Sequence, residues 1–289
     1  MNANTSARTR TAAQNAELAL LLEVAGTPKP GNVDRRRDLS DLRFEQFLAG
    51  AVGAGEGLRD AEAGDPIGEA FERAVGGMAA GHGQNTQFGA LLLLVPLVRA
   101  AIEDGGTLSP EGVRRVVEAT TVEDAAAFYR AFEYCEVFVD DPPEDAADLD
   151  VRRGSEAVPA LERRGLTLLD VMRLSEAEDD VAREWTGGFE RSFRAAELIT
   201  ESEGPLSDRG ARAFLDLLAE RPDTLVAKKH GERVAEGAME RAKRTRDAGD
   251  PDAIEALAEA FVEEGINPGT TADIVAAGLF VALERGVEP

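Results

Sequence analysis

The sequence predicts an all-α protein from three observations. Apolar residues recur at helical spacing along almost the whole chain, and strand-forming residues never gather in separated, alternating runs. Helix start signals are also explicit. Ser109 and Asp250 each precede a proline in the first helical position, and Thr121 with Asp124 fits a capping box. The predicted helices cover residues 11–25, 41–61, 66–80, 87–104, 110–119, 122–136, 151–163, 167–200, 207–220, 231–248, 251–265 and 270–286.

The ends of these helices coincide with residues that cannot continue them. The first helix carries an apolar stripe over 18–24 and ends where Pro28, Pro30 and Gly31 follow closely. The glycine-rich segment 81–89 separates the third helix from the apolar fourth. The acidic segment 140–150 (DDPPEDAADLD) separates the sixth helix from the seventh as a surface linker. An alternative for this segment is a DDxxD-like magnesium site, which its adjacent prolines disfavour.

Length and composition predict one globular domain. The 289 residues are near the size at which a single core stops growing, so we expect one domain over 11–286 after a disordered N-terminus at 1–10. The single cysteine, Cys135, excludes an intramolecular disulfide. No apolar run fits a signal peptide or a membrane span, so the predicted location is the cytoplasm.

The charge balance excludes two classes of partner and singles out the lysines. A formal net charge of −23 opposes binding to nucleic acid or to an anionic membrane. The acidic excess resembles that of proteins from salt-accumulating archaea, which predicts a halophilic protein. Only four of the 32 basic residues are lysines, and three of them, Lys29, Lys228 and Lys229, lie in two irregular segments. A compact ammonium suits phosphate, although chance placement is the alternative.

The segment TPKPGNVD at 27–34 interrupts the first helix. Proline fixes φ and disfavours helix at the preceding residue, so we expect an extended, rigid backbone that holds Lys29 toward a ligand. The alternative is a loop that only ends the helix.

The segment GHGQNTQFG at 81–89 precedes the apolar fourth helix. Asn85 or Thr86 would cap that helix, and a glycine-rich entry to a helix N-terminus is a ready anion site. His82 would be free there for proton transfer or ligand contact. The alternative is a glycine turn between packed helices.

Two further segments combine acids, threonines and cations. PDTLVAKKHG at 222–231 contains Asp223, Lys228 and Lys229, which a solvated helix end would also explain. GINPGTTAD at 265–273 places Asp273 in a first helical turn, where it either complements the helix dipole or holds a cation that bridges phosphates.

A set of regularly spaced acidic residues lies in the predicted helix 167–200. Glu176, Asp180 and Glu184 would share one helix face, which suggests a carboxylate row around a cation. A solvated face is the alternative.

Taken together, the four segments from 27 to 273 resemble the triphosphoribosyl-dephospho-CoA synthase family. TPKPGNVD is similar to the family's TPKPGLVD, NTQFG to the end of GGVNTHKG, Asp223-Thr224 to a DTN motif, and NPGTTAD to SPGGSAD. The resemblance runs from about residue 17 to 283. Where the family has His-Lys this chain has Gln87-Phe88, where it has the asparagine of DTN the chain has Leu225, and RRRDLSD replaces a His-containing stretch. These departures suggest an altered acceptor site.

The resemblance implies an enzyme that moves the triphosphoribosyl group of ATP to a ribose hydroxyl of dephospho-CoA, or of a related cofactor precursor, and releases adenine. It implies Mg²⁺ with the ATP. Because helix termini present unpaired backbone groups, we also expect the four segments to converge on one cleft with Lys29, Asn85, Asp223 and Asp273 around it. A different acceptor and a non-catalytic nucleotide-binding protein are the alternatives. The implied catalytic residues are Asp34, Asp223 and Asp273, with Asp34 and Asp273 also as metal ligands. The implied ATP-binding residues are Lys29, Gly31, Gly83, Asn85, Thr86, Gly89, Lys229 and Gly269.

Overall fold

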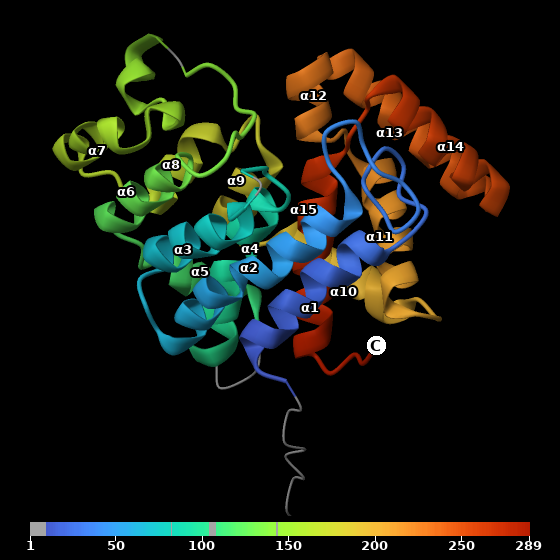
Figure 1. The fold of residues 1–289 in the computed structure, drawn as a ribbon, viewed down its shortest axis with the longest axis horizontal. Helices are drawn as coiled ribbons and strands as arrows, with labels where there is room; N and C mark the ends of the chain where they lie inside the picture. Colours follow the sequence, from blue (N-terminus) through green and yellow to red (C-terminus); the bar gives the residue numbers. More distant parts are fainter. Residues whose placement is uncertain (1–9, 82, 104–107, 143) are drawn as a thin grey trace, which may run out of the picture.

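The computed structural model describes residues 10–81, 83–103, 108–142 and 144–289, and it confirms the all-α prediction (Figure 1). Over these residues the chain contains helices, no strand, and one isolated β-bridge between Asp34 and Arg37. The helices are α1 (Ala12–Ala25), α2 (Phe44–Ala63), α3 (Ile67–Ala79), α4 (Phe88–Glu103), α5 (Pro110–Glu118), α6 (Val122–Ala131), η1 (Glu144–Leu149), η2 (Val151–Ala157), α7 (Val158–Arg164), α8 (Leu168–Ser175), α9 (Asp180–Gly187), α10 (Glu190–Glu201), α11 (Leu206–Glu220), α12 (Thr224–His230), α13 (Glu232–Ala248), α14 (Pro251–Glu264) and α15 (Gly269–Glu284).

The predicted helix 167–200 is wrong, because the chain forms α8, α9 and α10 there. Asp179 caps the start of α9: its Oδ1 accepts hydrogen bonds from the backbone N–H groups of Val181 (2.8 Å) and Ala182 (3.1 Å). Gly188 ends α9 in the left-handed region, with φ +77°. A capping carboxylate and a glycine therefore divide the segment that apolar periodicity alone predicted as one helix.

Other differences concern the middle of the chain and its start. The segment predicted as a linker contains the 3₁₀ helix η1, and the predicted helix 122–136 stops at Ala131. Residues 1–9 of the predicted disordered terminus lie outside the described residues, as does His82. Arg10, also predicted disordered, donates hydrogen bonds to Asn15 and Glu288. The remaining predicted helices differ from the observed ones mainly at their ends, except that 151–163 begins as the 3₁₀ helix η2.

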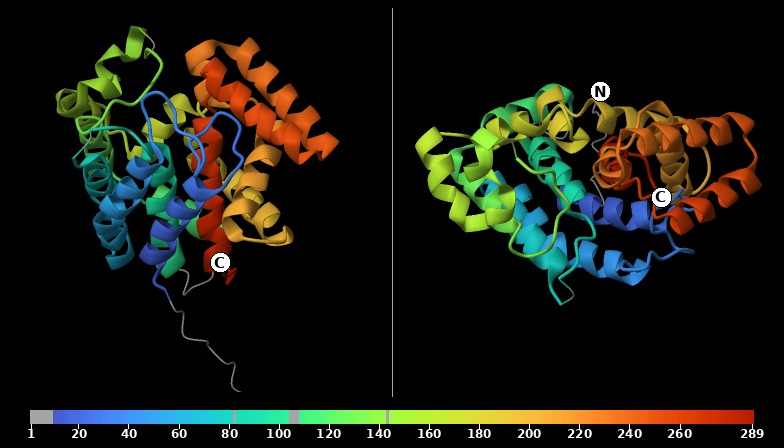
Figure 2. Two further views of the ribbon diagram at one scale, coloured as in Figure 1. Left: turned by 45° about the vertical axis from the view of Figure 1, so that its right-hand side comes forward. Right: turned by 90° about the horizontal axis from the view of Figure 1, so that it is seen from above.

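Helix α15 is the centre of the architecture (Figures 1 and 2). It packs against α1, α4, α10 and α11, and almost all its residues are buried. Helices α2, α3 and α6 lie on one side of it, and α12, α13 and α14 on the other. One contiguous apolar core extends from α1 to α15. Within the described chain, no helix combines the length and apolar character needed to cross a membrane.

The same arrangement positions the irregular segments. The loop after α1 and the N-terminal end of α15 lie at the same end of the molecule (Figure 1). Residues that are far apart in the sequence, such as Asn32 and Asn267, therefore meet there.

Candidate functional site

A cavity of about 620 Å³ lies where the four segments singled out by the sequence meet. This confirms the predicted convergence of the segments. Lys29 and Asp223, however, do not line the cavity. Its polar lining includes Glu23, Asn32, Asn85, Thr86, Gln87, Lys228, Lys229, Asn267, Thr270 and Asp273.

The cavity also has apolar and acidic lining residues. Phe128, Phe132 and Phe138 are among the apolar lining residues, and Asp140 and Asp141 also line the cavity. The segment predicted as a surface linker is therefore part of the site. Its carboxylates belong to no group of three His, Cys, Asp or Glu residues suited to a metal, and none occurs elsewhere in the described residues.

Lys29 does not present its ammonium to the cavity, which corrects the prediction of a free phosphate ligand. The side chain is fully buried. Its Nζ forms an ion pair with Glu23 and donates a hydrogen bond to Asn32 Oδ1 (3.1 Å). Asn32 Nδ2 in turn donates to Asn267 Oδ1 (3.0 Å). Lys29 thus ties the last turn of α1 to its own loop, which Asn32 connects to the loop before α15.

Gly31 has a packing role in the same loop. Its φ is +73°, and a Cβ there would lie 1.9 Å from the carbonyl oxygen of Ile266. It does not line the cavity, so the predicted ligand contact is corrected.

Asp34 is neither placed to react nor free to bind a metal, which corrects both predicted roles. It is fully buried and away from the cavity lining. Its Oδ2 accepts hydrogen bonds from Thr27 Oγ1 (2.8 Å) and Arg37 (3.0 Å), and its Oδ1 accepts one from the backbone N–H of Arg36 (2.8 Å). The carboxylate therefore holds the loop that follows α1.

Glu23 is a site residue that the sequence analysis missed. It lines the cavity although only 5% of its surface is exposed. Burial raises the pKa of its carboxyl, while the Lys29 ammonium lowers it and Asp34 raises it further. The sequence signal for this role was a glutamate inside the apolar stripe 18–24, six residues before Lys29.

The segment before α4 contributes a cap and three unpaired polar atoms. Asn85 Oδ1 accepts the backbone N–H of Phe88 (3.0 Å), so the predicted cap is confirmed. Thr86 Oγ1 and both polar atoms of the Gln87 amide are buried without a hydrogen-bond partner. Gly83 is exposed and does not line the cavity, which corrects its place among the predicted ATP-binding residues.

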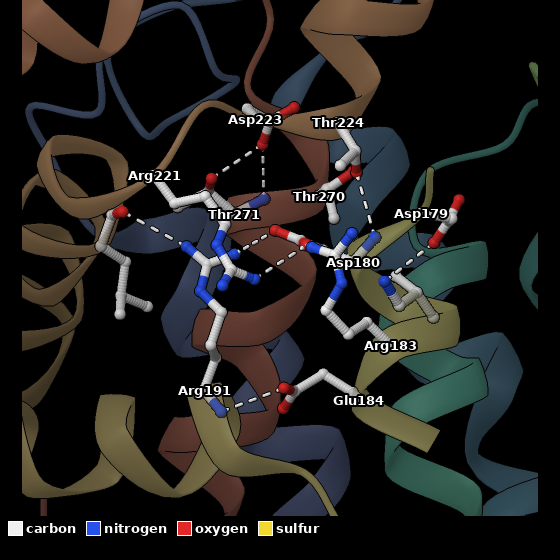
Figure 3. Close-up of polar contacts among 12 residues, drawn as sticks. Asp179, Asp180, Arg183, Glu184, Arg191, Arg221, Asp223, Thr224, Thr270 and Thr271 are labelled. Carbon is white, nitrogen blue, oxygen red and sulfur yellow. Dashed lines mark hydrogen bonds and ion pairs between the residues drawn. The ribbon is translucent and has the colours of Figure 1, made fainter. Parts of the chain in front are cut away.

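Asp223 is a structural carboxylate and not a base (Figure 3). Its Oδ1 caps α12 by accepting the N–H groups of Leu225 (2.9 Å) and Val226 (3.1 Å), and its Oδ2 accepts Thr271 N and Oγ1 (both 2.7 Å). Burial raises its pKa, while the bonds from Thr271 lower it. The predicted catalytic role is corrected, because its oxygen atoms already hold the starts of α12 and α15.

The two cations of α12 differ in their surroundings. Lys228 forms an ion pair with Asp179 and lies 3.9 Å from Asp140. Lys229 is exposed, and its Nζ lies 5.7 Å from the centre of the Phe138 ring. Of these two lysines, Lys229 therefore has the ammonium that is available to bind a ligand in the cavity.

Asp273 lines the cavity from the first turns of α15. Burial raises its pKa well above the ordinary value, the carboxylates of Glu23 and Asp223 raise it further, and the backbone N–H of Ala90 lowers it. Gly89 makes this position possible, since a Cβ there would lie 2.1 Å from Asp273 Oδ2. Gly269, at the start of α15, also lines the cavity.

The acidic row suggested by Glu176, Asp180 and Glu184 is wrong (Figure 3). Glu176 is exposed, whereas Asp180 is buried and forms ion pairs with Arg183, Arg191 and Arg221. Glu184 accepts the N–H groups of Arg191 (3.0 Å) and Ser192 (2.7 Å) at the start of α10. Asp180 and Glu184 are therefore occupied by arginine side chains and backbone N–H groups, and they form no carboxylate row with Glu176.

Comparison with known proteins agrees with this geometry. A family model described as ATP:dephospho-CoA triphosphoribosyl transferase matches residues 9–288. Among solved structures, the chain is similar to that of a proposed triphosphoribosyl-dephospho-CoA synthase from Archaeoglobus fulgidus. The TM-score is 0.70 at 29% sequence identity, over 85% of this chain and 100% of that chain. Comparison with curated protein sequences gave no match.

Proposed function

The chain belongs to the ATP:dephospho-CoA triphosphoribosyl transferase family, and on that basis we propose that its cavity carries out triphosphoribosyl transfer. The donor is ATP, the acceptor is a ribose hydroxyl of dephospho-CoA or of a related precursor, and adenine leaves. The observation that carries the proposal is the meeting of four segments, from Asn32 to Asp273, around one cavity lined by both apolar and polar side chains.

The reaction breaks the bond between ribose C1′ and adenine N9 and forms a bond from C1′ to the acceptor oxygen. Overall, one proton moves from the hydroxyl to adenine. Positive charge develops on the sugar, so a nearby carboxylate is required, together with a base for the hydroxyl. We assign the base to Glu23, which faces the cavity and is held by Lys29. Asp273 is the second carboxylate in reach.

The triphosphate has candidate partners on α12 and α15. Lys229 offers an exposed ammonium, and Gly269 and Thr270 line the cavity at the N-terminus of α15, where the helix dipole favours anions. Asn85, Thr86 and Gly89 complete the proposed ATP-binding wall at the start of α4.

Magnesium is expected with ATP, and the donor set fits it. Mg²⁺ bound to a nucleotide commonly takes one or two carboxylates and completes its coordination with phosphate and water oxygens. Asp273 would hold it, because its carboxylate lines the cavity and forms no ion pair with a described residue. When bound, the ion would neutralise phosphate charge.

The acceptor is the part of the reaction that this chain has changed. Phe88, in place of a lysine of the family motif, packs its ring against Phe71 (centroids 5.1 Å apart) and Phe132 (4.9 Å). An acceptor phosphate that relied on that lysine would lose a charge-assisted bond. We therefore propose that dephospho-CoA is a poor acceptor compared with a related precursor.

The net charge of −23 supports a halophilic setting. Concentrated salt would screen the repulsion among the acidic side chains.

The experiment is to incubate the protein with ATP, Mg²⁺ and dephospho-CoA, and to measure free adenine and the mass of the acceptor. Adenine release with a heavier acceptor supports the proposal. Adenine release with unchanged dephospho-CoA would mean that water takes the triphosphoribosyl group, so other ribosyl acceptors are then supplied, and no adenine with any of them would contradict the proposal.

Two matched variants test the binding wall. Lys229→Ala is expected to weaken ATP binding about ten-fold. Lys243→Ala removes another exposed lysine, on α13, that does not line the cavity, and it should leave ATP affinity unchanged. Equal affinities in both variants would remove Lys229 from the site.

A further inference from the structure

Three polar atoms in the cavity wall lack any hydrogen-bond partner. They are Thr86 Oγ1 and the Oε1 and Nε2 atoms of Gln87, and they are the buried side-chain atoms of the described chain for which this is true. Thr86 is 8% exposed and Gln87 4% exposed, yet both line the cavity. Leaving such groups unpaired is costly, so a native protein that keeps three together has a use for them.

The surrounding backbone is shaped to keep these atoms where they are. The backbone N–H of Gln87 donates to Met78 Sδ (3.2 Å), which fixes the residue at the start of α4. A Cβ at Gly50 of α2 would lie 2.6 Å from Thr86 Oγ1 and 3.2 Å from Gln87 Oε1. The glycine therefore leaves the space that these two side chains occupy.

The chemistry of the pair selects the class of ligand. A primary amide presents one donor and one acceptor side by side, and it carries no charge. It complements a planar group with an adjacent acceptor and donor, such as the edge of adenine, which glutamine binds through two hydrogen bonds. Phosphate is a poorer match, because the cations of the cavity lie on α12. Phe88 and Phe128 provide apolar surface in the same cavity.

We propose that Gln87, assisted by Thr86, binds the 6-aminopurine edge of a nucleotide in the cavity and determines base specificity. The inference rests on the proposed function, since both ATP and dephospho-CoA carry adenine. Asp273 packs on Gly89 in the first turn of α4, and Gln87 directly precedes that turn. A base held by Gln87 thus has its ribose near the carboxylates assigned to the sugar.

The stability of the ligand-free protein provides a readout that does not depend on activity. Gln87→Met keeps the length of the side chain and removes both unpaired atoms, so we expect the midpoint of thermal unfolding to rise by about 2–6 °C. Gln46→Met is the matched control. The Gln46 amide accepts the backbone N–H of Arg43 (2.7 Å), so this change should lower the midpoint.

Ligand binding is measured by calorimetry with ATP, dephospho-CoA and purine riboside 5′-triphosphate, which lacks the 6-amino group. The parent is expected to prefer ATP to the purine analogue by roughly 5- to 150-fold, the range for a bidentate contact to a base. Gln87→Met should lose that preference. Thr86→Val, which keeps the side-chain shape, should weaken binding of the same ligand to a smaller extent. Weaker ATP binding assigns the pair to the donor, and weaker dephospho-CoA binding assigns it to the acceptor.

Four results would overturn the inference. One is a parent that binds ATP and the analogue equally and whose dephospho-CoA affinity is unchanged by Gln87→Met, and another is a Gln87→Met variant that binds every ligand as the parent does. A lower unfolding midpoint for Gln87→Met would mean that the amide is needed for the fold. A parent that binds neither ATP nor dephospho-CoA would overturn the proposed function as well, whereas the first three leave that function standing.

Discussion

Replacing Lys29 with methionine should destabilise the fold first and affect ligand binding only through Glu23. The Lys29 ammonium is fully buried, and its partner Glu23 is 5% exposed. Removing the lysine leaves the Glu23 carboxylate buried without a counter-charge, which typically costs about 3–5 kcal/mol. A direct phosphate contact would instead cost ATP affinity and leave the free energy of unfolding nearly unchanged.

The pH dependence of the variant gives a second signature. Burial already raises the pKa of Glu23 in the parent, and without the lysine nothing would oppose that rise. A carboxyl whose pKa is higher in the folded than in the unfolded protein contributes stability at low pH, and this contribution is lost as pH rises through the folded-state pKa. The Lys29→Met variant should therefore regain stability at pH 5 relative to pH 7.

Urea unfolding of the parent, Lys29→Met, Glu23→Gln and the double variant measures these effects. The double variant should be more stable than Lys29→Met, because it no longer buries an unpaired charge. A Lys29→Met protein with parental stability and ten-fold weaker ATP binding would refute the reasoning and return Lys29 to the phosphate site.

Three further outcomes follow from the packing. Gly89→Ala should displace Asp273 and so lower the rate of adenine release about 100-fold. Gly237→Ala, at a glycine with open space around it, should leave the rate unchanged. Equal rates in the two variants would contradict the close contact between Gly89 and Asp273. Asp180→Asn should cost about 3–5 kcal/mol in urea unfolding, because three arginines lose their counter-charge, and an unchanged midpoint would show that solvent already screens them. Phe88→Ala should cost about 3–5 kcal/mol by the same measurement, and a smaller loss with altered acceptor choice would place its ring against the ligand.

The sequence was sufficient for the fold class and for the segments of the site, because both depend on local signals. Helical periodicity and caps such as Thr121 with Asp124 act within a few residues, and the structure contains that capping box. The prediction failed over 167–200, where Asp179 and Gly188 interrupt a continuous apolar pattern. In a sequence, an acidic residue inside a helix looks the same as one that caps its start. Only the structure shows which backbone N–H groups donate hydrogen bonds to its carboxylate.

The roles of individual residues were harder to predict, because they depend on contacts between distant segments. Asp223 seemed a candidate base until its bonds to Thr271, 48 residues away, were visible. Lys29 seemed free because its partner, Glu23, lies within an apolar stripe. Conversely, the unpaired amide of Gln87 has no sequence signature, since only the complete surroundings of an atom show that nothing bonds to it.

The central position of α15 matters during synthesis of the chain. This last helix completes the packing of α1, α4, α10 and α11, and it supplies Asp273 and the loop that holds Asn32. While the ribosome still covers α15, the earlier helices have emerged with apolar stripes that lack their partner. Exposed stripes of this kind favour aggregation, so we expect nascent chains stopped before α15 to depend on chaperones and to bind no nucleotide.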